Sequence, residues 1–131
     1  MIRARVLSFG YGHAPAPQAD ITIDARRHLR NPHHDPAMRQ LTGLDPAVRR
    51  HVLDTPGADC LIRHTTACAT DLLTALPRPP ALMLTIAVGC VGGRHRSVAL
   101  AEEIAAVLRS QGIGVQVDHR DVTKPVIQRT A

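Results

Sequence analysis

Runs of apolar residues, separated by glycine, proline and polar turns, predict an alternation of short strands and helices along this chain. The clearest run covers residues 82–88, which are apolar, favour β structure and are few enough for a buried strand. A turn with three glycines follows at residues 89–93. From residue 97 to residue 108 the apolar residues recur at helical spacing. This stretch therefore predicts a buried strand, a glycine turn and a helix in direct succession.

Polar and apolar residues alternate in three further segments, as they do in half-buried strands. These segments are residues 3–9, 19–24 and 114–119. Because the strands alternate with helices, we expect one α/β domain over residues 1–131, with a mostly parallel sheet and helices on both faces. Residues 27–43 resemble a loop, and a loop of this length in a small domain indicates a functional segment.

Two helices are predicted between the second strand and the central strand. Asp45 and Pro46 are a suitable N-cap and first helical residue for a helix that ends near residue 53. Residues 58–76 form the second helix. Its candidate core positions are Leu61, Ile62, Cys68, Leu72, Leu73 and Leu76.

The cysteines and histidines do not predict a metal centre. The three cysteines, at positions 60, 68 and 90, form no CxxC pair, and their odd number argues against a disulfide framework. His33, His34 and Asp35 are adjacent, so their side chains point apart and no second cluster completes a site. We therefore expect neither a metal nor a cofactor, and we interpret Cys60 and Cys68 as core residues.

Charge is the feature of the composition that changes this picture. The formal net charge of +5 comes from fifteen arginines and one lysine and favours an anionic partner. Phe9 and Tyr11 are the only aromatic residues besides histidine, so a base-stacking platform for nucleic acid is not expected. No stretch approaches the ~18 apolar residues of a membrane span, so we expect a cytoplasmic protein without a membrane partner.

The glycine turn carries the strongest indication of chemistry. A strand, a glycine turn and a helix N-terminus direct free backbone N–H groups at an anion. Arg94, His95 and Arg96 lie in that turn or in the first helical turn, where each cation opposes the helix dipole by up to ~1 kcal/mol. An anion held between these side chains and the amides would explain their placement. The sequence therefore predicts a phosphate site, and the alternative is a tight turn with solvated arginines.

The same stretch, from Cys90 to Ser97, also has the spacing C-x5-R-S of the cysteine-dependent phosphatase loop. In that loop a thiolate attacks phosphorus while the arginine and the backbone amides hold the phosphate oxygens. Cys90 and Arg96 would then be the catalytic residues, although Gly89 replaces the histidine often found before the cysteine. The candidates for the general acid are Asp35, Asp118 and Asp121. Cys90 can equally be a small buried residue that a tight turn requires.

Six short motifs lie along the chain in a characteristic order. They are FGYG at 9–12, DAR at 24–26, LRNPH at 29–33, LTGLD at 41–45, GCVGGRHRSV at 89–98 and HR at 119–120. In this combination they resemble the C-terminal domain of the RapZ family of RNase adapter proteins. The resemblance covers roughly residues 4–125.

This resemblance implies a phosphofructokinase-like α/β fold that binds an aminosugar phosphate, glucosamine-6-phosphate, as a signal. It also implies binding of structured RNA, contact with an endoribonuclease and assembly into a homo-oligomer. The Walker-type domain that precedes this domain in the family is missing from the sequence, so we expect a stand-alone domain without ATP or GTP chemistry. Val91 stands where the family commonly has threonine. The basic C-terminal tail of the family is reduced in this sequence to Lys124 and Arg129.

We therefore interpret the chain as a non-catalytic, regulatory domain that binds a small phosphorylated sugar, with the cysteine-dependent phosphatase as the alternative. The residues expected to hold the phosphate are Cys90, Val91, Gly92, Gly93, Arg94, His95, Arg96 and Ser97. Those expected to close over the sugar are Asp24, Arg26, Asn31 and His33. The first two follow the second strand, at the edge of a parallel sheet where ligands bind.

Overall fold

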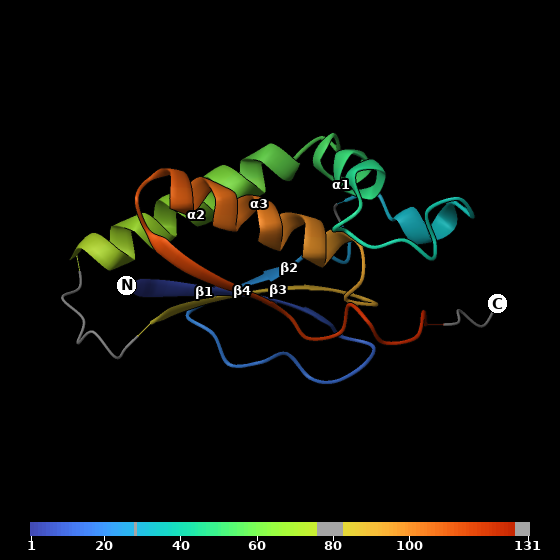
Figure 1. Cartoon of the computed structure of the whole chain (residues 1–131), viewed down its shortest axis with the longest axis horizontal. Helices are drawn as coiled ribbons and strands as arrows, with labels where there is room; N and C mark the ends of the chain where they lie inside the picture. Colours follow the sequence, from blue (N-terminus) through green and yellow to red (C-terminus); the bar gives the residue numbers. More distant parts are fainter. Residues whose placement is uncertain (28, 76–82, 128–131) are drawn as a thin grey trace.

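Four parallel strands form the centre of the structure, with helices packed over them (Figure 1). The structure is a computed structural model that describes residues 1–27, 29–75 and 83–127. Its strands are β1 (Ile2–Gly10), β2 (Ile21–Asp24), β3 (Leu84–Cys90) and β4 (Gly114–His119). Its helices are α1 (Pro46–Leu53), α2 (Ala58–Ala75) and α3 (Arg96–Ser110), with a short 3-10 helix η1 at Pro32–His34. The predicted α/β class and the parallel sheet are confirmed.

The predicted elements are present, with small differences at their ends. β3 continues to Cys90, two residues beyond its expected end, and the expected start at residue 82 lies outside the described residues. α1 begins after Asp45 as expected, but the Asp45 carboxylate accepts a hydrogen bond from the Thr42 N–H (2.7 Å) instead of capping the helix amides. The predicted loop at 27–43 contains η1 and a series of turns.

All three helices of the described chain lie on one face of the sheet (Figure 1), so the expectation of helices on both faces was wrong. The strand order is β2–β3–β1–β4. The connections from β2 to β3 and from β3 to β4 therefore cross the sheet in the same direction. Because such crossovers are right-handed, their helices fall on the same face. The connection from β1 to β2, residues 11–20, runs in the opposite direction and crosses the other face without a helix (Figure 1).

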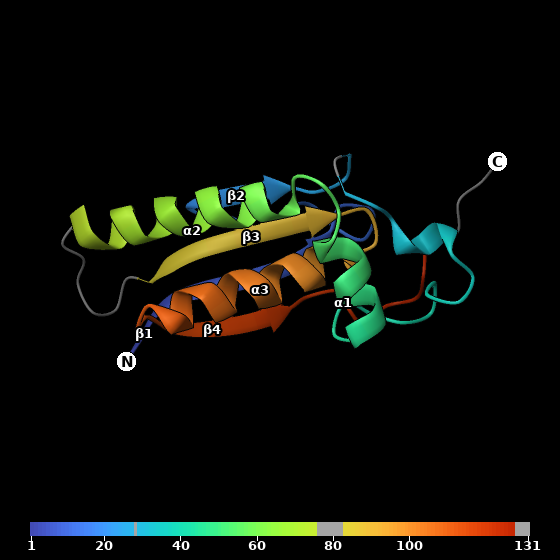
Figure 2. The ribbon, with the colours of Figure 1, turned by 90° about the horizontal axis from the view of Figure 1, so that it is seen from above.

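The core lies between the sheet and this helical layer. Alternate strand residues point toward the helices and are fully buried, among them Ala4, Val6, Leu84, Ile86 and Val88. From α3, the buried residues at helical spacing include Leu100, Ile104 and Leu108. Seen from above, α2 and α3 run side by side along the strands, and α1 lies at one end of them (Figure 2). No helix in the described part of the chain is long and apolar enough to cross a membrane.

The face that α2 buries differs from the expected one. Its buried residues are Ala58, Ile62, Thr65, Thr66, Ala69 and Leu73. Cys60 and Cys68 are both exposed, so their interpretation as core residues was wrong. The helical period places the two cysteines off the buried stripe, and threonines occupy core positions in their place. The Thr66 hydroxyl is satisfied there because it donates to the carbonyl of Ile62 (2.8 Å). Leu61 and Leu72 are half-buried, and Leu76 lies outside the described residues.

Candidate functional site

A pocket opens beside the glycine turn, at the carboxyl end of β3. Its empty volume is about 450 Å³ when the open mouth is included. The residues that line it are Asn31, His33, Cys90, Val91, Gly92, Arg94, His95, Arg96, Pro125, Val126 and Ile127. This is the edge of a parallel sheet at which ligands bind in open α/β folds. The pocket therefore joins the glycine turn to the 27–43 loop and to the C-terminal segment.

Most of the predicted binding residues line this pocket. Asn31 and His33 come from the start of η1 and reach it from a segment about sixty residues away in sequence. Gly93 and Ser97 are buried and are not among its lining residues. Asp24 and Arg26 are not among them either, so the structure does not bring these two residues to the pocket.

Asp24 and Arg26 form a pair of their own. The Arg26 guanidinium donates to both carboxylate oxygens of Asp24, at 2.9 and 2.6 Å. It also lies 3.8 Å from the centre of the Tyr11 ring. The hydrogen bond from Arg26 holds the pKa of Asp24 below its ordinary value. Both partners are thus engaged with each other and with an aromatic ring.

The glycine turn rests directly on the turn that follows β1. Gly93 has a left-handed backbone (φ 68°), and a Cβ on it would lie 2.5 Å from the amide nitrogen of Gly10. The N–H groups of Tyr11 and Gly12 donate to the carbonyls of Cys90 and Val91, both at 2.9 Å. Glycines in both turns are therefore needed because the two backbones touch.

Cys90 is buried, with 3% of its surface exposed. The Gly93 N–H donates to its sulfur (3.3 Å), and the Ser97 hydroxyl oxygen lies 3.1 Å from the sulfur. The residue before it must be glycine, because a Cβ at Gly89 would lie 2.4 Å from the Phe9 ring and 2.6 Å from the Tyr11 ring. The histidine often found there in phosphatase loops therefore does not fit this packing.

The three basic residues after the turn all contact backbone carbonyls of segments that are distant in sequence. Arg94 donates to the carbonyls of Gln40 and Leu41, the latter at 3.0 Å. The His95 Nε2 lies 3.1 Å from the carbonyl oxygen of Arg39. Arg96, which is buried, donates to the carbonyls of Ala25 (3.2 Å) and Arg26 (2.7 Å). A bound anion was the expected explanation for the positive charge of Arg94 and Arg96. In the structure, the carbonyl oxygens that these side chains contact already compensate part of that charge.

His95 is a neutral donor near pH 7 rather than a cation. Burial lowers its pKa below the ordinary value, although the carbonyls of Leu41 and Arg39 oppose this effect. A neutral imidazole can still donate one N–H to a carbonyl or to a ligand oxygen. The permanent positive charge at the pocket therefore comes from Arg94 and Arg96.

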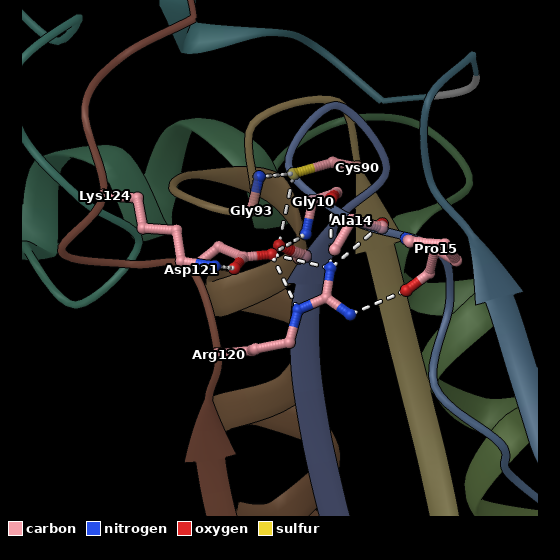
Figure 3. A network of polar contacts seen from close by, with 9 residues as sticks. Gly10, Ala14, Pro15, Cys90, Gly93, Arg120, Asp121 and Lys124 are labelled. Carbon is pink, nitrogen blue, oxygen red and sulfur yellow. Dashed lines mark hydrogen bonds and ion pairs between the residues drawn. The ribbon is translucent and has the colours of Figure 1, made fainter.

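Arg120 and Asp121, directly after β4, form a polar network next to the glycine turn (Figure 3), in which Asp121 has a structural role and not the predicted role of a general acid. Asp121 is completely buried and accepts a hydrogen bond from the Gly10 N–H at 2.7 Å. Its carboxylate also pairs with Arg120 (2.9 Å) and with Lys124 (2.6 Å). Arg120 in turn donates to the carbonyls of Gly10, Ala14 and Pro15 at 3.2, 3.1 and 2.7 Å. In the sequence, the adjacent opposite charges of Arg120 and Asp121 are the feature that indicates this network.

The three candidate general acids are all occupied elsewhere. Burial alone would raise the pKa of Asp121, but the hydrogen bonds from Arg120, Lys124 and Gly10 outweigh it and lower the pKa to about 2. Asp118 pairs with Arg5 at 2.8 Å, and this hydrogen bond lowers its pKa. Asp35 accepts from the Ala37 N–H at 2.9 Å. None of these three residues lines the pocket, and Asp121 carries no proton to donate at neutral pH.

Two further observations complete the site. The apolar residues Pro125, Val126 and Ile127 line the pocket, and they were not among the predicted binding residues. Across residues 1–27, 29–75 and 83–127, no three histidine, cysteine, aspartate or glutamate side chains gather closely enough to hold a metal ion.

Comparisons with known proteins show what the chain is similar to in sequence. The family model of the RapZ C-terminal domain matches residues 2–123. A nucleotide-binding protein of Thermobifida fusca is 44% identical over 92% of this chain and 41% of its own length. Another from Rhodospirillum centenum is 46% identical over 91% of this chain and 36% of its own length, and one from Trichlorobacter lovleyi is 42% identical over 91% and 41%. The chain thus spans about two-fifths of the length of these relatives. By the match of the family model, which covers nearly the whole chain, this domain belongs to the RapZ C-terminal domain family.

Proposed function

We propose that this domain binds a small phosphorylated sugar, with glucosamine-6-phosphate as the first candidate, in the pocket at the end of β3. The observation that carries this proposal is the composition of the lining. The glycine turn and the N-terminus of α3 meet Asn31 and His33 from a distant segment. The first N–H groups of a helix have no partner within the helix, so they are suited to phosphate oxygens.

The side chains around the turn supply the remaining contacts of such a ligand. The phosphate would be held by the turn amides beside Arg96, whose guanidinium supplies positive charge while it donates to the carbonyls of Ala25 and Arg26. Asn31 and His33 would receive sugar hydroxyl or amino groups, because both side chains offer donors and acceptors. The domain would act as a sensor, since none of the three candidate general acids, Asp35, Asp118 and Asp121, lines the described pocket.

The name of the relatives supplies a competing ligand class. They are called nucleotide-binding proteins, and a nucleotide shares the phosphate group with a sugar phosphate. The chain spans only about two-fifths of the length of those proteins. A nucleotide is therefore a ligand to test beside the sugar phosphate.

Isothermal calorimetry tests the proposal directly. Glucosamine-6-phosphate should bind more tightly than inorganic phosphate or GMP, and glucosamine should give no binding heat. His33→Ala should weaken binding of the sugar phosphate at least about tenfold, since a lost hydrogen bond in a site costs ~1.4 kcal/mol or more. His34→Ala is the matched control, because His34 is exposed and does not line the pocket. No heat with any phosphorylated ligand at millimolar concentration would contradict the proposal.

The alternative, a cysteine-dependent phosphatase, is favoured by one observation. The Cys90 sulfur accepts the Gly93 N–H at 3.3 Å, a contact that would also stabilise a thiolate. The low pKa of Asp121 and the packing at Gly89 argue against it. Hydrolysis of an aryl phosphate that disappears in Cys90→Ser would establish the phosphatase, whereas a sensor retains ligand affinity in that variant and shows no turnover.

A further inference from the structure

The residues that line the pocket include a polar set and an apolar set, which we call its polar wall and its apolar wall. The polar wall consists of Asn31, His33, Arg94, His95 and Arg96. The apolar wall consists of Val91, Pro125, Val126 and Ile127. A phosphate group is satisfied by donors and positive charge, so an apolar surface adds nothing to its binding. A ligand that fills the whole pocket therefore combines an anionic group with a face of C–H groups, which a pyranose ring carries.

The apolar wall is attached to the polar network next to the glycine turn. Lys124 lies directly before it and pairs with the buried carboxylate of Asp121 at 2.6 Å (Figure 3). The Lys124 N–H also donates to the Asp121 carbonyl at 3.1 Å, which forms a turn. From the other side, Arg94 reaches the carbonyls of Val122 and Lys124 at 3.4 and 3.5 Å. These contacts fix the direction in which the chain enters the wall.

The far end of the wall rests on the turn that follows β1. A Cβ on Gly12 would lie 2.4 Å from the Cδ1 atom of Ile127, so the isoleucine occupies the space that glycine leaves. Val126 and Ile127 are both half-buried and retain surface that faces the pocket. The wall is therefore a packed part of the domain with apolar surface left for a ligand.

We propose that Pro125, Val126 and Ile127 are the specificity-determining residues of this pocket, and that they contact the sugar ring while the glycine turn contacts the phosphate. This inference rests on the proposed function and assigns its selectivity to the C-terminal segment. Burial of ring C–H groups against these side chains distinguishes a sugar phosphate from free phosphate, because apolar burial contributes in proportion to the area removed from water.

The test compares two dissociation constants in the full chain, for glucosamine-6-phosphate and for inorganic phosphate. In Ile127→Ala, and more strongly in Val126→Ala combined with Ile127→Ala, the affinity for the sugar phosphate should fall about fivefold to tenfold. The affinity for inorganic phosphate should stay within about twofold. In Ile127→Val, the ratio of the two dissociation constants should stay close to the wild-type ratio. Val107→Ala is the matched control, because Val107 is half-buried in the C-terminal half of α3, far from the pocket.

The outcomes separate this inference from the proposed function. If the wild type binds both ligands and the double variant leaves their ratio unchanged, the apolar wall does not select the sugar and the inference is wrong. If the wild type binds neither ligand, the proposed function fails and the inference fails with it. Thermal unfolding of each variant shows whether the fold is retained, and equal losses for both ligands in a folded variant would also contradict the inference.

Discussion

The carboxylate of Asp121 is fully buried, yet it is ionised, because Arg120, Lys124 and the Gly10 N–H all donate to it. A pKa of about 2 in the folded protein lies below the ordinary value of 3.8. This difference corresponds to ~2.5 kcal/mol of folding stability. Asp121→Asn should remove about this amount at pH 7, measured by urea unfolding, because it breaks the pairs while it keeps the side-chain volume.

The dependence on pH follows from the direction of this shift. A carboxyl group with a depressed pKa stabilises the fold fully above its unfolded-state pKa and loses that effect as the pH falls toward its folded-state pKa. The stability difference between wild type and Asp121→Asn should therefore be constant above pH ~5 and shrink between about pH 4 and 2. Asp118→Asn is the control, since its pair with Arg5 is more than a third exposed and contributes ~1 kcal/mol at most. Equal effects of the two substitutions would contradict the assignment.

Adjacent glycines in the turn should respond differently to substitution by alanine. Gly93 has a positive φ, and its Cβ would meet the backbone of Gly10, so Gly93→Ala should cost about 2 kcal/mol or more of folding stability. Gly92 has no atom within 4 Å of an added Cβ, so Gly92→Ala should change stability by less than about 1 kcal/mol. Thermal unfolding of both variants tests this, and a strong destabilisation by Gly92→Ala would show that the turn is packed differently.

Arg94 connects two loops that are far apart in sequence. Its guanidinium donates to the carbonyls of Gln40 and Leu41 on one side and reaches Val122 and Lys124 on the other. Lysine lacks the planar fork, so Arg94→Lys should loosen both loops while the sheet is retained. Hydrogen exchange at the amides of 40–43 and 122–124 should become about tenfold faster, with exchange in β1 and β3 unchanged.

A substitution on an exposed helix face is the control for this prediction. Arg63→Lys removes a guanidinium from α2. In the described part of the chain, the ion pair of Arg63 is with Asp59, one helical turn away, at 2.9 Å. Exchange in both loops should stay at the wild-type rate. Unchanged exchange in Arg94→Lys as well would show that Arg94 does not restrain the loops.

The orientation of α2 can be read from thiol chemistry. Cys60 and Cys68 are exposed on this helix, whereas Cys90 is buried behind the glycine turn. A thiol reagent should therefore modify two cysteines rapidly in the native protein and the third only slowly or after unfolding. Cys90→Ser should leave the rapid phase at two thiols per chain, and a single rapid thiol would mean that α2 is rotated from the position described.

For the molecule as a whole, the net charge of +5 leads us to propose weak binding of structured RNA through its phosphates. Arg27 and Arg30, which are exposed and precede Asn31 in the sequence, are available for this contact. Affinity in a gel shift should fall at least about tenfold between about 50 and 200 mM salt, since each phosphate contact releases counterions. Charge reversal at Arg27 and Arg30 should flatten this dependence. Binding that is indifferent to salt, or absent at low salt, would contradict the proposal.

Local patterns were sufficient to predict much of this domain. The two-residue period of the strands, the helical period after the glycine turn and the Asp45–Pro46 start of α1 all appear near their expected places. These features depend on residues within a few positions of each other, whose steric preferences act in any context, although the Asp45 side chain does not cap α1. The motifs around residues 29–33 and 89–98 also predicted which segments share the pocket, and family membership is confirmed.

Other features depend on which segments become neighbours in space. The single helical layer follows from the strand order β2–β3–β1–β4 together with right-handed crossovers, and local periodicity does not encode that order. The carbonyl partners of Arg94 and Arg96 come from loops about thirty to seventy residues away in sequence. The same holds for the burial of Asp121 beside Gly10 and for Ile127 beside Gly12 at the pocket, because these contacts join the two ends of the chain, which only the tertiary structure brings together.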